Sequence, residues 1–146
     1  MESKKAEQAV ACFKSDFSCS QAVFSTYAEQ LGLDKQVALK ISCAFGGGMA
    51  RRAETCGAVT GALMVIGLKH GKARPDDNDA KDRTYALAGE FVERFKARHS
   101  SIVCRELLGC DIGTSEGKQT FDENKYEETR CSKFVADAAT ILEEIL

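Results

Sequence analysis

The sequence predicts an all-α protein, a single-domain bundle of about five to seven helices that spans residues 1–146. Apolar residues recur every three or four positions through most of the chain, which is the period of an α-helix. No segment alternates apolar and polar side chains as a half-buried strand does, and no internal repeat is present. With 44% hydrophobic and 29% charged residues, the chain has a globular composition and needs no disulfide to fold.

Capping residues and glycines mark where the predicted helices begin and end. Asp16 or Ser18 caps the second helix and Gly32 follows its last residue, while Asp34 and Thr55 cap the third and the fourth. The predicted helices cover residues 2–14, 19–31, 35–45, 56–69, 76–98, 101–108 and 131–146. Outside 56–69, the residues expected to face the core are Ala6, Ala9, Val10, Phe13, Val23, Phe24, Tyr27, Leu31, Val37, Ala38, Ile41, Phe45, Tyr85, Ala88, Phe91, Val92, Phe95, Phe134, Val135, Ala138, Ile141, Leu142 and Ile145.

The helix predicted over 56–69 is apolar almost all round, so we expect a central, Gly/Ala-rich helix of the bundle. Gly57 and Gly61 lie four residues apart on one face, and small residues there allow another backbone to come close. Two other segments are expected to be irregular. Gly46–Gly48 ends the third helix as a flexible loop, and the polar stretch 111–126 is predicted to be a loop that could include one helical turn.

Charge and hydropathy exclude several classes of protein. The 20 Lys and Arg residues against 22 Asp and Glu give a net charge of −2, which argues against a nucleic-acid-binding face. The longest mostly apolar stretch, 58–68, is too short to span a membrane. Residues 1–10 lack the apolar core of a signal peptide. We therefore expect a cytoplasmic protein, a compartment in which stable structural disulfides are uncommon.

Seven cysteines are the feature that points to function. Cys12 and Cys43 lie inside predicted helices, and we expect them to be packing residues. Cys110 directly follows the glycine that ends the helix 101–108. At the first turn of a helix, unpaired N–H groups and the helix dipole stabilise a thiolate. The cysteines predicted at such positions are Cys19, Cys56, Cys104 and Cys131.

Cys56 has the sequence surroundings of an activated thiol. It precedes Gly57 at the start of a capped helix, and it follows a loop that contains three glycines and the pair Arg51 and Arg52. These neighbours indicate an electropositive and accessible site. The chain has no Cys-x-x-Cys pair, so neither a zinc ribbon nor a thioredoxin-type motif is indicated.

Other side chains that often carry chemistry have structural explanations here. His70 and His99 are the only histidines, and both fall near the ends of predicted helices, where a positive charge interacts well with the dipole. Gly46–Gly48 lacks the Lys-Ser/Thr pair of a phosphate loop. The acidic run 76–79 lacks the glycine and the distal glutamate of a calcium loop.

The cysteine segments taken together resemble a known family. They are Ser-Cys-Ser-Gln-Ala-Val at 18–23, Thr-Cys-Gly-Ala-Val-Thr-Gly-Ala at 55–62, Cys-Arg-Glu-Leu-Leu-Gly-Cys at 104–110 and Thr-Arg-Cys at 129–131. From Cys19 to the end, the chain resembles the small family of redox-active proteins named for the pattern C…GCAxxG…C…C. The order here is Cys56-Gly57 rather than Gly-Cys. The resemblance implies a redox or metal-linked role for Cys19, Cys56, Cys131 and either Cys104 or Cys110.

We expect thiol redox chemistry with a redox partner protein. In this hypothesis Cys56 is the activated thiolate, and it forms a reversible disulfide with one or more of four other cysteines. These are Cys19, Cys104, Cys110 and Cys131. Whether the chain is itself an enzyme stays open, as does a homodimer formed through its apolar helices.

The alternative hypothesis is a metal carrier or electron-transfer protein without turnover. Three or four thiolates would hold a soft metal ion such as zinc, or an iron–sulfur cluster. The ligands would be Cys19, Cys56, Cys104 and Cys131. The absence of close-spaced ligand pairs counts against this hypothesis. A third hypothesis is an interaction protein whose cysteines only pack in the core.

Overall fold

The structure is a computed structural model that describes residues 3–146, so the predicted helix start at residue 2 lies outside the described residues. No described residue belongs to a β-strand, and a single bridge pairs Thr55 with Val103. The all-α prediction is confirmed. The α-helices are α1 (Lys4–Lys14), α2 (Cys19–Ala28), α3 (Lys35–Ser42), α4 (Gly46–Met49), α5 (Gly57–His70), α6 (Asn78–His99), α7 (Cys104–Leu108), α8 (Ser115–Glu123) and α9 (Ser132–Ile145).

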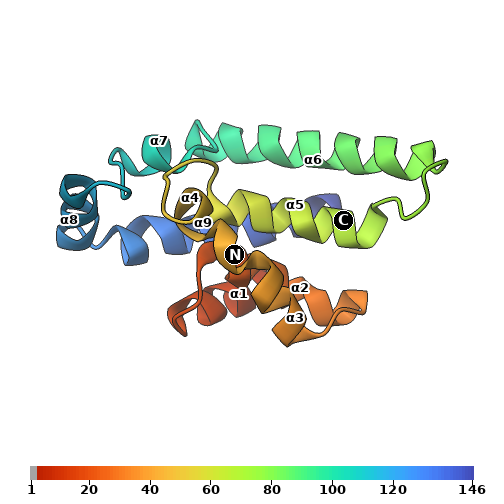
Figure 1. Cartoon of the computed structure of the whole chain (residues 1–146), viewed down its shortest axis with the longest axis horizontal. Helices are drawn as coiled ribbons and strands as arrows, with labels where there is room; N and C mark the ends of the chain where they lie inside the picture. Colours follow the sequence, from red (N-terminus) through yellow and green to blue (C-terminus); the bar gives the residue numbers. More distant parts are fainter. Residues whose placement is uncertain (1–2) are drawn as a thin grey trace.

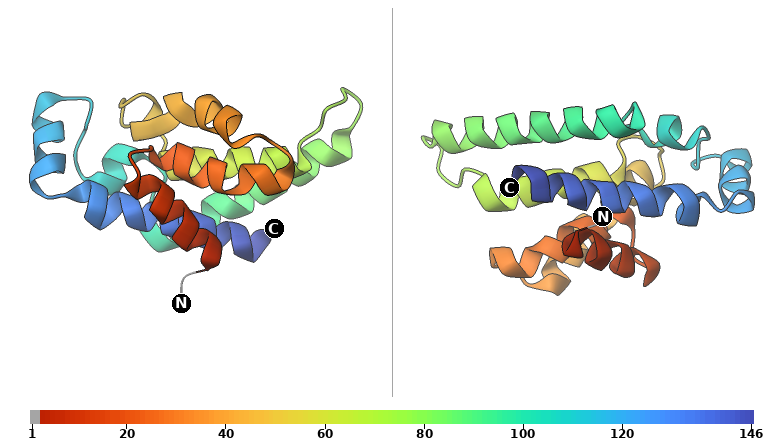
Figure 2. Two further views of the ribbon diagram at one scale, coloured as in Figure 1. Left: turned by 90° about the horizontal axis from the view of Figure 1, so that it is seen from below. Right: turned by 180° about the vertical axis from the view of Figure 1, so that it is seen from behind.

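The long helices run side by side and the short ones gather at one end. Helix α6 lies along one side of the molecule, α5 and α9 run next to it, and α1 to α3 cover the opposite side (Figure 1). Helices α4, α7 and α8 lie at the same end, with α8 standing across the end of α9 (Figure 2). No helix within residues 3–146 is both long and apolar enough to span a membrane.

Helices α2 and α5 pack with their backbones very close together. A Cβ atom added to Gly57 would lie 2.6 Å from Cys19 Sγ, and one added to Gly61 would lie 2.8 Å from the Ser20 carbonyl oxygen. The expectation that these two glycines allow a close approach is confirmed. The contact places the N-terminus of α5 directly against the N-terminus of α2.

Three of the residues expected in the core are exposed. Val37 and Ile41 are 42% and 51% exposed, because α3 turns Ala38 and Ser42 toward the interior instead. Tyr85 is 68% exposed, because α6 reaches the core through Phe91 and Phe95 in its second half. The apolar pattern alone did not show which side chains of these two helices are buried.

Two segments expected to be irregular contain regular hydrogen-bonded structure. The polar segment predicted as a loop contains α8, whose first turn is capped by the Thr114 hydroxyl accepting from the Gly117 N–H at 3.0 Å. Gly46–Gly48 is part of a hydrogen-bonded turn rather than a flexible loop. The start of α5 also differs, since Cys56 itself occupies the N-cap position predicted for Thr55.

The two histidines end helices as predicted. His70 is the last residue of α5 and His99 the last residue of α6. The His99 Nε2 lies 2.8 Å from the Asp137 Oδ2, and its ring packs between Phe95 and Phe134. His99 therefore links the end of α6 to α9 through these contacts.

Candidate thiol site

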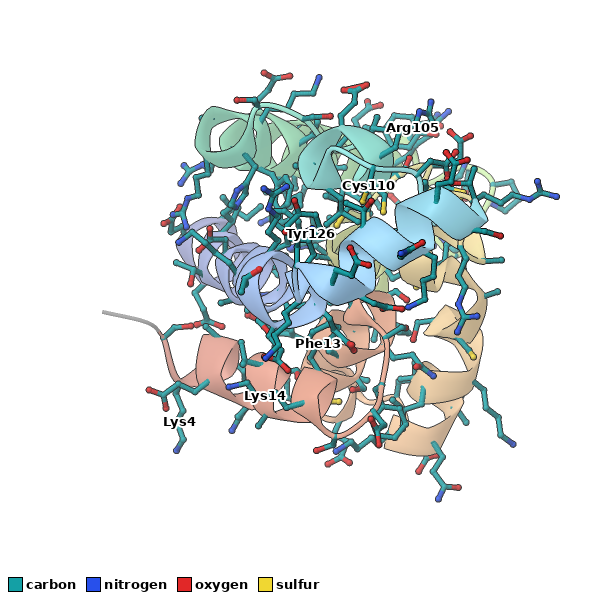
Figure 3. The ribbon with its side chains drawn as sticks, turned by 90° about the vertical axis from the view of Figure 1, so that its left-hand side faces the viewer. Lys4, Phe13, Lys14, Arg105, Cys110 and Tyr126 are labelled. Carbon is teal, nitrogen blue, oxygen red and sulfur yellow. The ribbon has the colours of Figure 1, made fainter. Side chains whose placement is uncertain are left out.

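A cavity of about 600 Å³ lies where α1, α2, α4, α5, α7, α8 and α9 meet. Four of the five candidate cysteines line it, although they are far apart in the sequence. Figure 3 looks onto this end of the molecule and shows sulfur atoms gathered beneath the labelled Cys110. All seven cysteines are free thiols. The candidate cysteines on the cavity wall are Cys19, Cys56, Cys104 and Cys131.

Cys19 is the first residue of α2 and sits in a ring of backbone N–H groups. The Ser18 hydroxyl and the Gln21 side chain form a capping box that fixes this helix start. The Cys19 sulfur accepts hydrogen bonds from the Cys56 thiol and from the backbone N–H groups of Gly47, Ser20 and Cys19 itself. The Cys56 bond is the largest cause, and together these donors overcome burial and lower the pKa of Cys19 to about 7.

Cys56 has the opposite electrostatic role from the one expected. It is the N-cap of α5 and is only 5% exposed. Its hydrogen bond to Cys19, its burial and the nearby Cys19 charge raise the pKa of Cys56 well above the usual value. The expectation of an accessible Cys56 thiolate is therefore corrected, because Cys19 holds more backbone donors and Cys56 keeps the proton.

A left-handed turn supplies one of the donors to Cys19. Gly47 and Gly48 have φ values of +67° and +70°, and Met49, Ala50 and Arg51 continue with φ between +54° and +67°. Only glycine adopts this conformation without steric cost, and consecutive left-handed residues are rare. Hydrogen bonds from the N–H groups of Ala53 and Glu54 to the carbonyls of Gly47 and Gly48 close the turn, at 3.2 and 2.9 Å. The turn thereby holds the Gly47 N–H against the Cys19 sulfur.

Cys104 and Cys131 line the same cavity but are not activated. Burial, with the nearby Cys19 and Cys110, raises the pKa of Cys104 to about 12 even though it is the first residue of α7. Burial, then the charges of Cys19 and Cys104, raises the pKa of Cys131 well above its usual value. Cys131 is also not at a free helix start, because a π-helical turn over Glu127–Cys131 leads directly into α9.

A comparison with protein-family models finds a match over most of the chain. A family described as "Putative redox-active protein (C_GCAxxG_C_C)" matches residues 17–145. The chain belongs to the C_GCAxxG_C_C family. This membership confirms the family resemblance of the sequence and supports a redox role in broad terms. The comparison with curated proteins and the comparison with solved structures found no match.

The C_GCAxxG_C_C pattern leaves the third cysteine position ambiguous in this chain. The two candidates, Cys104 and Cys110, differ in their position relative to the cavity. Cys104 is on its wall and is buried, whereas Cys110 is absent from the wall and is partly exposed. Cys110 follows Gly109, whose φ of +71° ends α7, and it is close enough to Cys104 to raise the pKa of that thiol. Burial raises the pKa of Cys110 itself.

The cysteines outside the family pattern have different environments. Cys12 is half-buried in α1, where its Sγ lies 3.6 Å from the Ser25 Oγ. Cys43 was expected to pack inside a helix, but it is exposed and reaches the edge of the cavity. It lies in a 3₁₀ turn that follows α3, which turns it away from the core.

The metal hypothesis gains no support from the geometry. Within residues 3–146, no group of three or more His, Cys, Asp or Glu side chains is arranged to hold a metal ion. The four cavity cysteines share a wall without converging on one point. The ligand set named from the sequence stays a prediction that would require these thiols to move together.

The main features that the sequence analysis missed are the left-handed turn and a lysine on the cavity wall. The wall includes Arg51 from the turn, which the sequence analysis named as a neighbour of Cys56, and Lys118 from α8. Three consecutive glycines were the available signal for the turn, since a run of glycines marks backbone that other residues cannot adopt. Lys118 had no such signal, because its helix was predicted to be a loop.

Proposed function

We propose that this protein is a thiol redox protein in which Cys19 and Cys56 form a reversible disulfide. One observation carries the proposal: the two side chains share a hydrogen bond, and the pKa of Cys19 is lowered to about 7 while the pKa of Cys56 is raised. Around neutral pH the pair therefore releases its first proton from Cys19 and keeps its second proton on Cys56. A thiolate beside a protonated thiol is the arrangement that two-step disulfide exchange requires.

The exchange begins with Cys19. Its thiolate attacks one sulfur of a substrate disulfide, so that a mixed disulfide forms and the other substrate sulfur leaves as a thiolate. Cys56 then transfers its proton to a thiolate and attacks the Cys19 sulfur, which releases the second substrate sulfur. The substrate disulfide gains two electrons from Cys19 and Cys56 and one proton from Cys56, and the other released thiolate takes its proton from solvent. The reverse sequence reduces the protein.

The pKa of Cys19 also suits an attacking group at neutral pH. A thiol with a much higher pKa is protonated, and one with a much lower pKa is a weaker nucleophile, so the optimum lies near the ambient pH. Cys104 and Cys131 stay protonated under the same conditions because their pKa values are raised. Of Cys19, Cys56, Cys104 and Cys131, Cys19 is therefore the thiol that reacts first.

A redox titration tests the proposal. The protein is equilibrated in buffers of defined thiol–disulfide potential, and its free thiols are counted after acid quenching. We expect a transition that loses two thiols with a two-electron slope, about 30 mV per tenfold change in ratio. Cys19→Ser and Cys56→Ser should each abolish it, and Cys12→Ser, outside the cavity, should leave it unchanged. A two-thiol transition that persists without Cys19 or without Cys56 would overturn the proposal.

A further inference from the structure

The cavity in front of Cys19 has the dimensions of a small-molecule site. Its volume of about 600 Å³ is within the range of pockets that enclose small organic ligands. Its apolar lining includes Phe13, Phe134 and Leu107, which come from three different helices. Cys56 lies on the same wall and is only 5% exposed. A substrate disulfide must enter this cavity to reach the Cys19 sulfur, and a small molecule does so more readily than a folded protein.

Within the described part of the chain, Arg51 is the unpaired cation on the wall and is available to an anionic ligand. Its side chain packs over Gly47, because a Cβ atom on Gly47 would lie 3.0 Å from Arg51 Cγ. Gly47 is also the residue whose N–H binds the Cys19 sulfur. Within residues 3–146 Arg51 forms no salt bridge, whereas Lys118, the other cation on the wall, is paired with Asp122 at 2.8 Å.

We propose that the cavity binds a low-molecular-weight disulfide that carries a carboxylate, with Arg51 as the group that recognises the carboxylate. The inference rests on the proposed exchange at Cys19 and Cys56, and it names the substrate class. Guanidinium groups bind carboxylates through two parallel hydrogen bonds, which orients a ligand as well as attracting it. Two acidic residues, Asp16 and Glu127, also line the cavity and accommodate an amino group on the same ligand.

The step proceeds as follows for a symmetrical substrate RSSR. The Cys19 thiolate forms a mixed disulfide with one RS unit and releases the other as RS⁻. Cys56 then attacks the Cys19 sulfur and displaces the second RS unit, and its proton passes to one of the two released thiolates. RSSR is reduced to one thiol and one thiolate, which takes a proton from solvent according to its own pKa, and the Cys19–Cys56 pair is oxidised to a disulfide.

The experiment compares three small disulfides that differ in charge. Dithiodiglycolate carries carboxylates, 2-hydroxyethyl disulfide is neutral and cystamine is cationic. The rate at which each oxidises the reduced protein is measured, and it is divided by the rate of the same disulfide with a free small thiol. We expect dithiodiglycolate to have the highest normalised rate, and its advantage should shrink as salt screens the charges.

Arg51→Gln and Arg52→Gln provide a matched pair of variants. The two arginines are neighbours and both are exposed, but only Arg51 lines the cavity. Arg51→Gln should lower the normalised rate of dithiodiglycolate about fivefold, the size of one exposed charge pair. The same variant should leave the rate of 2-hydroxyethyl disulfide unchanged, and Arg52→Gln should change neither rate.

The outcomes distinguish a failure of this inference from a failure of the proposed function on which it rests. Equal normalised rates for the three disulfides, or an equal loss in Arg51→Gln and Arg52→Gln, would overturn the inference and leave the Cys19–Cys56 exchange intact. Exchange with protein disulfides alone would also overturn it. A protein that forms no Cys19–Cys56 disulfide with any of these oxidants would overturn the proposed function itself.

Discussion

The Cys19 and Cys56 side chains hydrogen-bond to each other where the N-termini of α2 and α5 meet. Gly57 makes this contact sterically feasible, because a side chain there would overlap the Cys19 sulfur. Backbone N–H groups of three residues lower the pKa of Cys19, whereas that of Ala58 alone lowers the pKa of Cys56. The pair is therefore asymmetric, with the negative charge on Cys19 and the proton on Cys56.

The first prediction concerns the pH dependence of alkylation. Cys19 should react with iodoacetamide with a midpoint near pH 7, and Cys56 should react slowly, because a thiolate is the reactive species. Mass spectrometry of peptides after timed labelling measures each site. If Cys56 is alkylated before Cys19, the assignment of the charge is wrong.

Two substitutions of Cys56 distinguish the effect of its hydrogen bond on Cys19 from the effect of its size. Cys56→Ala removes the largest cause of the lowered pKa, so the alkylation midpoint of Cys19 should rise toward 9.0. Cys56→Ser retains a hydroxyl donor and should raise the midpoint less. Equal midpoints in the two variants would show that the side-chain donor does not act on Cys19.

The second prediction concerns stability against pH in reducing buffer. The pKa of Cys19 is about 7 in the folded protein and near 9.0 in the unfolded chain, so between these values Cys19 binds more protons in the unfolded chain. Stability should therefore rise from pH 7 and reach a maximum below pH 9. At higher pH it should fall, because Cys56, Cys104 and Cys131 deprotonate in the unfolded chain and keep their protons in the folded protein.

Urea unfolding at a series of pH values measures this profile. The Cys19→Ser variant should lose the rise above pH 7 and keep the fall at higher pH. An unchanged rise in that variant would mean that another group causes it.

The third prediction uses two glycines of α5. Gly57→Ala should destabilise the protein by about 1–3 kcal/mol, because the new Cβ would lie 2.6 Å from Cys19 Sγ and 3.0 Å from the Ser20 nitrogen. Gly67→Ala is the control in the same helix, where a Cβ meets nothing within 4 Å, and it should stabilise by up to about 1 kcal/mol. Urea unfolding measures both, and a stabilising Gly57→Ala would contradict the close packing of α2 on α5.

The fourth prediction concerns the left-handed turn. Ala50 has a φ of +54°, which costs an L-residue about 1–2 kcal/mol, so Ala50→Gly should stabilise the protein by about 1 kcal/mol. Ala86→Gly, at an exposed position inside α6, should instead destabilise by about 1 kcal/mol. Thermal unfolding compares the two, and destabilisation of similar size in both would argue against a left-handed Ala50.

The fifth prediction addresses bound metal. Protein purified without oxygen should contain far less than one zinc or iron per chain, because no group of three donors within residues 3–146 is arranged for a metal. Metal analysis of the wild type and of Cys19→Ser and Cys131→Ser tests this. A stoichiometric metal that either substitution removes would favour the metal hypothesis over the disulfide.

Much of the fold was predictable because its signals are local. Ser18, Gly32 and Asp34 end or begin helices as expected, since a cap acts on residues next to it. Helix α8 was missed because it is polar throughout and its partly buried Phe121 is a weak apolar signal. Val37 and Ile41 were assigned to the wrong face because the face is chosen by the contact with α2, which is not local.

The candidate cysteines were recognisable, but their electrostatic roles were not. Spacing and helix starts identified Cys19 and Cys56, and both lie on the cavity. The charge on Cys19 depends on the N–H of Gly47, which a left-handed turn brings back from 28 residues away along the chain. No local pattern around Cys56 reveals that more backbone N–H groups act on Cys19, its neighbour in space, than on Cys56 itself.

The central claim is that Cys19 and Cys56 are a disulfide pair, and peptide mapping of the oxidised protein tests it most directly. Reduced protein is treated with a limited amount of a small disulfide, the remaining thiols are blocked at low pH, and the linked peptides are identified by mass spectrometry. The account predicts that a Cys19–Cys56 link forms first and in the highest yield. A sample in which other cysteines become linked while Cys19 and Cys56 both remain thiols would contradict it.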